Sequence, residues 1–249
     1  MNKLLSLPLN KILNFRKSNT KIPYQSVWFK GSYYPGLLKT RRIFYSFDIL
    51  RELSGKSFVD LGCNRGGIVF LAEENGASPT IGIDLKQERI KEARKIAKNE
   101  NASSQFINAN ILDYIETMNP VDFVCCTAVF RHIYGQLMSK FDPSFVVPKQ
   151  YLVYKSMDVL IRQNVGDPRE VTQAFNDILR KMLNKTKSRF ICSFNDNSGL
   201  IARRPYEVDK FFKSLHSRVD TTETYIADFT MPKYVVINIK MKPLESGNN

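Results

Sequence analysis

Four residues of this 249-residue chain combine carboxylates and glycines at a spacing that suits a nucleoside ligand. Asp60, Gly62 and Gly66 lie in the stretch SFVDLGCNRGG, and Asp84 closes the stretch TIGID twenty-two residues after Gly62. Glycines let the backbone approach a ligand closely, and a carboxylate at the end of the next strand accepts hydrogen bonds from ribose hydroxyls. The pattern therefore predicts a strand, a glycine-rich turn, a helix and a second strand.

Two nucleoside ligands compete for such a turn. A nicotinamide dinucleotide favours glycine at the first, third and sixth turn positions, so that its pyrophosphate can reach a helix N-terminus. Here the third position is Asn64, and Asp60 stands two residues before the first glycine. A carboxylate at that place is poorly suited to a pyrophosphate and well suited to a cationic amino-acid group.

The same residues resemble the first motif of the class I S-adenosylmethionine (SAM) methyltransferases, an acidic residue, a variable residue and then Gly-x-Gly-x-Gly. Asp60, Gly62 and Gly66 match it, and Asn64 replaces the middle glycine. The resemblance covers roughly residues 40–242. It implies an α/β, Rossmann-like fold with a mostly parallel seven-stranded sheet and a C-terminal antiparallel hairpin. It also implies SAM as the cofactor.

The resemblance assigns cofactor contacts along the chain. The glycine-rich turn would hold the methionine end of SAM, Asp84 the ribose, and Asn110 with the Ile111 backbone the adenine. A carboxamide oxygen at Asn110 can accept the hydrogen bond that an aspartate accepts in the family. The full set of cofactor-binding residues expected is Asp60, Gly62, Cys63, Asn64, Gly66, Asp84, Leu85, Asn110, Ile111 and Thr127.

Alternating strand and helix patterns position these residues and predict a parallel sheet. Strands are expected near 57–61, 80–84, 104–108, 121–127 and 188–194, and helices near 40–53, 66–75, 86–99 and 206–215. A further helix begins at the Asp-Pro-Arg-Glu stretch 167–170. The final extended runs, 223–229 and 233–241, are close enough for an antiparallel hairpin. The excess chain at 139–167 is expected to form an acceptor-side insertion with a helix at 149–163, or else a structural elaboration.

Three residues after the fourth strand are candidates for acceptor chemistry. His132 has a side chain suited to removing a proton near neutral pH, although a histidine that only stabilises the strand-to-helix turn would look the same. Arg131 and Tyr134 could orient an anionic or planar acceptor, or face solvent. Two histidines and four cysteines without a Cys-x-x-Cys pair offer no plausible zinc site, so no metal is expected.

The first 47 residues carry nine basic side chains and no acidic one, within a chain of formal net charge +13. We expect residues 1–39 to form a basic extension before a methyltransferase domain at 40–249. The extension suits a lid, with Trp28 or Tyr33 packing on the ligand, or a nucleic-acid contact. Two further interpretations are a solvated surface that binds no ligand and contact with an anionic membrane surface through residues 1–21.

The sequence thus predicts a SAM-dependent methyltransferase whose acceptor is a small molecule or glycan precursor, or an RNA. It contains no apolar run near the ~18 residues of a membrane span and no secretory signal pattern, which favours a cytoplasmic protein. The alternative is a catalytically inactive SAM-fold module that binds RNA or a protein partner. The departures at Asn64 and Asn110 motivate that alternative.

Overall fold

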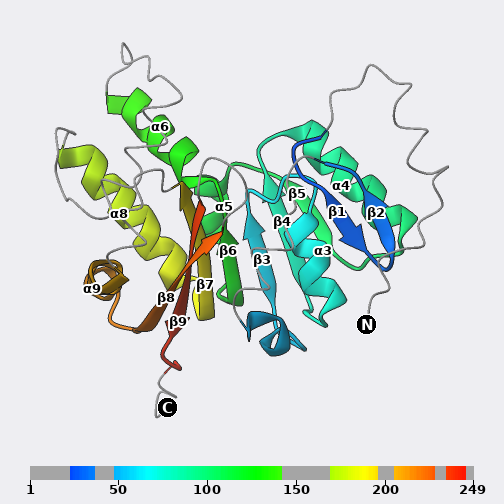
Figure 1. The fold of residues 1–249 in the computed structure, drawn as a ribbon. Coiled ribbons are helices and arrows are strands. Elements are labelled where there is room, and N and C mark those ends of the chain that lie inside the picture. Colours follow the sequence, from blue (N-terminus) through cyan, green and yellow to red (C-terminus); the bar gives the residue numbers. More distant parts are fainter. Residues whose placement is uncertain (1–22, 37–47, 142–168, 196–204, 228–233, 245–249) are drawn as a thin grey trace.

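A seven-stranded sheet forms the centre of the computed structural model, which describes residues 23–36, 48–141, 169–195, 205–227 and 234–244. The strand order is β5-β4-β3-β6-β7-β9-β8 (Figure 1). β3 to β7 pair in parallel, whereas β9 runs antiparallel to both β7 and β8. The expected fold class is confirmed. The strands are β3 Phe58–Leu61, β4 Thr80–Asp84, β5 Gln105–Asn108, β6 Val121–Cys126, β7 Thr186–Asn195, β8 Val219–Ala227 and β9 Tyr234–Met241.

Successive side chains of the central strands point to opposite faces of the sheet, and those on both faces are buried. Helices therefore cover both faces. Val59 and Leu61 pack into one cluster with α5, α6, α8 and α9. Phe58 points to the opposite face, where it packs with α3 and a short 3-10 helix at Asp48–Glu52. The helices are α3 Gly67–Glu74, α4 Gln87–Asn99, α5 Ile111–Thr117, α6 Phe130–Phe141, α8 Arg169–Asn184 and α9 Pro205–Leu215.

A β-hairpin that was not among the predicted elements lies on the outside of α3 (Figure 1). Its strands are β1 Val27–Phe29 and β2 Ser32–Tyr34, and its two-residue turn places Lys30 at φ 47° and Gly31 at φ 81°. Such left-handed pairs match the twist of a tight hairpin. Phe29 is fully buried, with its ring 5.0 Å from that of Phe70 in α3. The hairpin is therefore packed onto the domain.

Several expected segments lie outside the described residues. These are 1–22, most of the helix expected at 40–53, and the insertion from 142 to 168 with its helix at 149–163. The domain boundary at 39/40 and the insertion therefore remain predictions. Within 48–52, where the structure does describe the chain, the helix is 3-10 rather than α. Among the described helices, none has the length and apolar character needed to span a bilayer.

Candidate functional site

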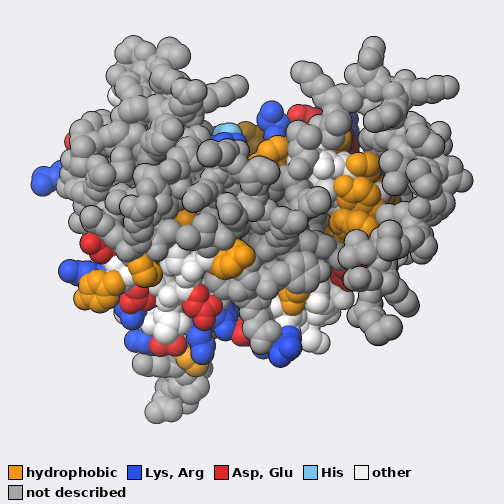
Figure 2. Space-filling view, in the orientation of Figure 1, with side chains coloured by type: hydrophobic (Ala, Val, Ile, Leu, Met, Phe, Trp, Pro, Cys, Tyr) orange, Lys and Arg blue, Asp and Glu red, His pale blue; other side chains and the backbone are white. Residues whose placement is uncertain are grey.

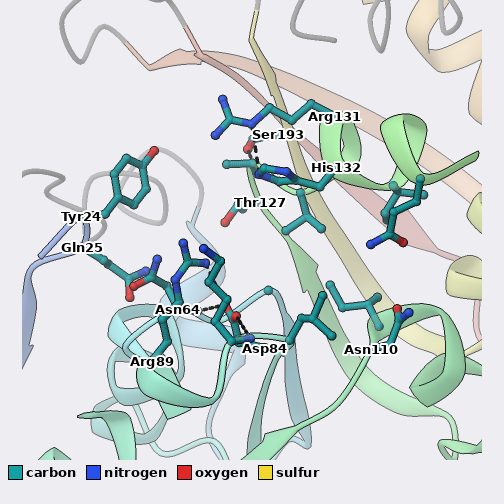
Figure 3. A pocket seen from close by; sticks show the side chains of 18 of the residues that line it. Tyr24, Gln25, Asn64, Asp84, Arg89, Asn110, Thr127, Arg131, His132 and Ser193 are labelled. Carbon is teal, nitrogen blue, oxygen red and sulfur yellow. Dashed lines mark hydrogen bonds and ion pairs between the residues drawn. The ribbon is translucent and has the colours of Figure 1, made fainter. Parts of the chain in front are cut away.

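A cavity of about 420 Å³ opens beside the carboxyl ends of β3, β4, β5 and β6. Ligands bind at this edge in open α/β sheets. Figure 3 shows polar side chains from these strand ends pointing into it from several sides. Nine of the thirteen residues singled out from the sequence line the cavity: Gly62, Asn64, Asp84, Leu85, Asn110, Ile111, Thr127, Arg131 and His132.

The glycine-rich turn reaches its shape through three left-handed residues. Gly62 has φ 94°, Asn64 φ 53° and Gly66 φ 82°. Asparagine is among the few residues other than glycine that adopt this region readily, because its short polar side chain bonds locally. Asn64 therefore adopts, in place of the middle glycine of the motif, a left-handed conformation that asparagine tolerates. At Gly62 an added Cβ would lie 2.2 Å from Val129 Cγ2, so this position also requires the absence of a side chain.

Asp84 is nearly buried and already holds three donors. Its Oδ2 accepts from the Asn64 backbone N–H at 3.0 Å and from the Arg89 guanidinium at 3.3 Å, and its Oδ1 accepts from the Lys86 N–H at 2.9 Å. The dashed contacts in Figure 3 fix the carboxylate at the floor of the cavity. This carboxylate therefore joins the glycine-rich turn to the start of α4 and presents an oriented negative charge to the cavity.

Asn110 begins α5 as its N-cap. Its side-chain Oδ1 accepts the Leu112 N–H at 3.0 Å, which satisfies one of the unpaired donors of the first turn. The capping bond uses one lone pair of Oδ1, so the other lone pair and the side-chain NH2 remain for a ligand in the cavity, which Asn110, Ile111 and Leu112 line. The residue expected at the adenine is thus held in one orientation by its own helix.

Three residues of the turn region lie behind the cavity wall. Gly66 is the N-cap of α3, and the Cys63 thiol packs against Gly82 in β4. Asp60 is 1% exposed, and among the described residues its oxygens accept no regular hydrogen bond; the Cys125 thiol in β6 is a weak donor beside them. Burial raises the pKa of Asp60 to about 7, the Cys125 thiol opposes the rise, and the charge of Asp84 adds to it. These residues support the site without lining it.

The opposite wall of the cavity begins at a strained turn after β6. Ala128 has φ 57°, a conformation that is costly for a residue with a Cβ, and its N–H donates to Ser193 Oγ at 2.9 Å. α6 starts two residues later, so the positive end of its dipole is at the cavity. This turn places Arg131 and His132 across the cavity from Asp84 (Figure 3).

Arg131 and His132 contact each other. Arg131 Nε donates to His132 Nε2 at 3.3 Å. Partial burial lowers the pKa of His132, and the positive charges of Arg131 and Arg89 lower it further, while Asp84 opposes them. His132 is therefore neutral at physiological pH, and its Nε2 lone pair is occupied by the arginine.

Three aromatic residues for which ligand contacts were expected do not line the cavity. Tyr134 is fully buried, with its ring 6.1 Å from that of Phe175 in α8, and it does not line the cavity. Trp28 and Tyr33 stack on each other across the hairpin, with ring centroids 4.6 Å apart, and neither lines the cavity. The preceding residues, Tyr24 and Gln25, do so instead.

Gln25 and Arg65 attach the N-terminal segment to the glycine-rich turn. The Gln25 side-chain Oε1 accepts from the Gly67 N–H at 3.0 Å, at the start of α3, where the local N-cap supplies no side-chain bond. Arg65 donates to the carbonyls of Gln25 and Pro35 at 3.1 and 2.9 Å. The segment 23–36 is thus part of one cavity wall.

Sequence reasoning missed several residues of the site. Arg89 and Gln136 carried a usable signal, because Arg89 lies in the first turn of the helix that follows Asp84 and Gln136 lies four positions after His132 on the same helix. Tyr24, Gln25 and Ser193 carried none, since only the tertiary fold brings them to the cavity. Among the described residues, no group of three or more His, Cys, Asp or Glu side chains is arranged to hold a metal ion.

The sequence matches a family model described as a methyltransferase domain over residues 52–224, most of the chain. A segment of 109 residues, 41% of the chain, is 28% identical to a ubiquinone biosynthesis O-methyltransferase from Actinobacillus pleuropneumoniae serotype 5b (strain L20). That segment covers 46% of the relative, so the chain spans less than half the length of this curated protein.

Two solved structures share the fold at low sequence identity. Magnesium protoporphyrin IX methyltransferase from Synechocystis PCC 6803, with bound SAM, is 14% identical with a TM-score of 0.53, over 81% of this chain and 79% of that one. The bifunctional kinase-methyltransferase WbdD is 16% identical with a TM-score of 0.56, over 93% of this chain and 46% of that one. At these identities the likeness concerns the fold alone.

Proposed function

We propose, because the chain belongs to the methyltransferase domain family, that its cavity binds SAM and that the protein transfers the methyl group to an acceptor. One observation carries this proposal. The glycine-rich turn, Asp84 and Asn110 come from three different strand ends and line one cavity. Such a set can bind an amino-acid group, a ribose and a purine in a row.

The residues present fit that cofactor. Gly62 lets the turn lie close to Val129, where an added Cβ would collide with that side chain, and Asp84 offers oriented carboxylate oxygens for ribose hydroxyls. The orphaned carboxylate of Asp60 lies behind the same turn, where a nearby cationic ligand would stabilise its charged form. When bound, SAM supplies a methyl group already activated on a sulfonium, so the protein has only to align the acceptor and exclude water.

The acceptor approaches, in this proposal, along the wall formed by α6. Arg131, His132 and Gln136 lie there, opposite the carboxylate that would hold the ribose. A small molecule or glycan precursor and an RNA are the two acceptor classes that the sequence favours. Arg131 as an orienting cation remains a proposal for this wall. The general-base role predicted for His132 is not favoured, because its Nε2 receives the Arg131 Nε–H.

Calorimetric titration with SAM tests the proposal. Wild-type protein should bind SAM at micromolar concentration, and Asp84→Ala should weaken binding at least tenfold, about 1.4 kcal/mol. Asp177→Ala is the matched control, since this exposed carboxylate pairs with Arg180 on α8, away from the cavity. Methyl transfer to an acceptor fraction that Asp84→Ala abolishes would exclude the inactive module.

Failure to bind SAM in the wild type would overturn the proposal. Retained RNA or partner binding by Asp84→Ala, with no requirement for a methyl donor, would instead identify a non-catalytic binding module. A thermal unfolding curve of each variant keeps lost binding distinct from lost folding. The two substitutions remove the same chemical group, so only the location of the carboxylate differs between them.

A further inference from the structure

We propose that the acceptor is an oxygen anion, a carboxylate or a phosphate, that binds Arg131 and is methylated on its ionised oxygen without a general base. This inference rests on the proposed function above and names its acceptor class. The relevant observations are the charges that line the cavity, the engagement of the groups that could act as bases, and the surface around them.

Positive charge exceeds negative charge in the cavity. Lys86, Arg89 and Arg131 line it, and Asp84 is the sole carboxylate among the described lining residues. Arg89 is paired with Asp84 at 3.3 Å, so that pair is internally neutralised. Arg131 has no ion pair among the residues that the structure describes. A guanidinium in a half-enclosed cavity favours a charged partner, which here must come from a ligand.

The geometry of Arg131 suits a bidentate anion. Its Nε donates to His132 Nε2 at 3.3 Å. The two terminal nitrogens remain for a ligand, and they match the spacing of two oxygens in a carboxylate or phosphate. α6 begins with its positive end at the same wall, which adds to the attraction for an anion.

None of the described groups in the cavity is ready to take a proton from a neutral acceptor. Asp84 already accepts three hydrogen bonds, from Asn64, Lys86 and Arg89. The Nε2 lone pair of His132 receives the Arg131 Nε–H. Around His132 the charged groups are Arg131, Arg89 and Lys86, with Asp84 as the opposing charge. An acceptor that is already ionised at neutral pH requires no base.

The transfer balances without any proton leaving the acceptor. A lone pair of the anionic oxygen forms the new C–O bond as the C–S bond of the sulfonium breaks, and that electron pair returns to sulfur. The sulfonium becomes a neutral thioether, and the acceptor loses one negative charge. A carboxylate thereby becomes a neutral ester and loses its charge attraction to Arg131, whereas a phosphate monoester keeps one of its two charges and is held more weakly than before.

The size of the cavity favours a small acceptor over an RNA. An RNA backbone is bound by a continuous track of basic groups. On the face drawn in Figure 2, the described surface carries acidic and basic side chains interspersed, most clearly over the lower part of the molecule. The cavity is near the lower end of the range for drug-sized ligands, roughly 300–1,000 Å³, so little room remains beside the donor.

A binding experiment tests the anion site directly. Full-length protein saturated with S-adenosylhomocysteine is titrated with benzoate, phenyl phosphate and the neutral benzamide. We expect saturable binding of at least one anion and none of benzamide. Arg131→Met should weaken anion binding at least tenfold, because it keeps an apolar stem and removes the charge. Arg180→Met is the matched control, an exposed arginine that pairs with Asp177 on α8.

Binding of S-adenosylhomocysteine itself separates the two proposals. If the wild type does not bind it, both proposals fail. If wild type and Arg131→Met bind it alike, yet neither anion binds wild type at millimolar concentration or benzamide binds as well, only the anion site is overturned. The anion site is likewise overturned if an RNA oligonucleotide binds in place of the anions and Arg131→Met leaves its affinity unchanged.

The labelled product then distinguishes the two anion sources. With radiolabelled SAM and an acid-soluble metabolite fraction, a carboxylate acceptor yields a methyl ester that releases labelled methanol in mild alkali. A phosphate acceptor yields a methyl phosphate that resists the same treatment. Either product elutes from an anion exchanger with one negative charge fewer than its acceptor. Label on nitrogen or on a neutral hydroxyl would overturn the inference.

Discussion

The two walls of the cavity differ in how completely their polar groups are paired. On the wall formed by β3, β4 and β5, Asp84 holds three donors and Asn110 caps its own helix. On the wall formed by β6 and α6, Arg131 contacts only the neighbouring His132, among the residues that the structure describes, after a turn that strains Ala128. The wall of β3, β4 and β5, whose polar groups are already oriented, suits a ligand of constant shape such as the methyl donor. The wall of β6 and α6, where Arg131 has no ion pair among the described residues, suits an anionic acceptor.

Gly62→Ala should produce the largest effect, because this residue touches both walls. The new Cβ would be 2.2 Å from Val129 Cγ2, on a backbone with φ 94°. Overpacking and left-handed strain each cost about 1–3 kcal/mol, so we expect the free energy of unfolding to fall by about 3 kcal/mol. SAM affinity should fall at least tenfold. Urea unfolding and calorimetry measure the two effects.

Gly55→Ala separates the two causes of that loss. Gly55 has φ 71° but nothing within 4 Å of an added Cβ, so this variant reports backbone strain alone. The double variant Gly62→Ala/Val129→Ala removes the contact and should recover only part of the stability. Equal losses of unfolding free energy in Gly62→Ala and Gly55→Ala would show that the contact between the added Cβ and Val129 costs no stability.

Asp60→Asn should produce the next largest effect, and one that depends on pH. With a folded pKa of about 7 against an ordinary 3.8, the folded protein keeps the proton of Asp60 to higher pH than the unfolded chain does. The stability from this group is therefore present below pH 3.8 and is lost as the pH rises toward 7. Without a methyl donor, Asp60→Asn should gain stability over wild type between about pH 4 and 8, on the order of 2–3 kcal/mol.

Asp122→Asn should change the free energy of unfolding with the opposite pH dependence to Asp60→Asn. Hydrogen bonds from the Ser57 N–H and Oγ, at 3.0 and 2.6 Å, lower the pKa of Asp122 against the effect of its partial burial. Its contribution is present at neutral pH and is lost as the pH falls through the lowered value. Urea titrations of both variants across the pH range should therefore diverge from wild type at opposite ends. If the stability of Asp60→Asn stays parallel to that of wild type across the pH range, the raised pKa of Asp60 is contradicted.

Gln25→Ala should produce the smallest effect, confined to the wall that carries the N-terminal segment. The substitution leaves the buried Gly67 N–H without its acceptor, at a cost of about 1–2 kcal/mol of unfolding free energy. We expect SAM affinity to fall less than in Asp84→Ala. Gln173→Ala, an exposed glutamine on α8, should be neutral in the same thermal unfolding assay. A larger affinity loss than in Asp84→Ala would make Gln25 a direct ligand contact.

The paired wall could be predicted from the sequence because its geometry is local. The motif from Asp60 to Gly66 and the carboxylate at Asp84 sit at strand ends whose register follows from the parallel sheet. The order of elements from β3 to β9 was predictable for the same reason. The hairpin was missed, although Lys30-Gly31 between two aromatic runs is a turn signal.

The other wall depends on a helix phase that the sequence pattern already contained. Phe130, Ile133, Tyr134 and Leu137 follow helical spacing and are all buried. Reading that face would have assigned Tyr134 to the core and left Arg131 and His132 toward the cavity. The contact of Arg131 with His132, and the strained Ala128, have no sequence signal, since they follow from how β6 and α6 meet.

Arg65 has a consequence for how the molecule opens. One terminal nitrogen of its guanidinium bonds the carbonyls of Gln25 and Pro35, near the two ends of the hairpin segment, and so closes that segment into a loop. Closing this loop costs conformational entropy. The two hydrogen bonds from Arg65, which lies thirty or more positions further along the chain, offset that cost. Arg65 thus holds the two ends of the segment, while Phe29 independently packs the hairpin onto Phe70 of α3. Loss of the Arg65 hydrogen bonds should therefore loosen Tyr24 and Gln25 at the cavity before the hairpin or the sheet opens.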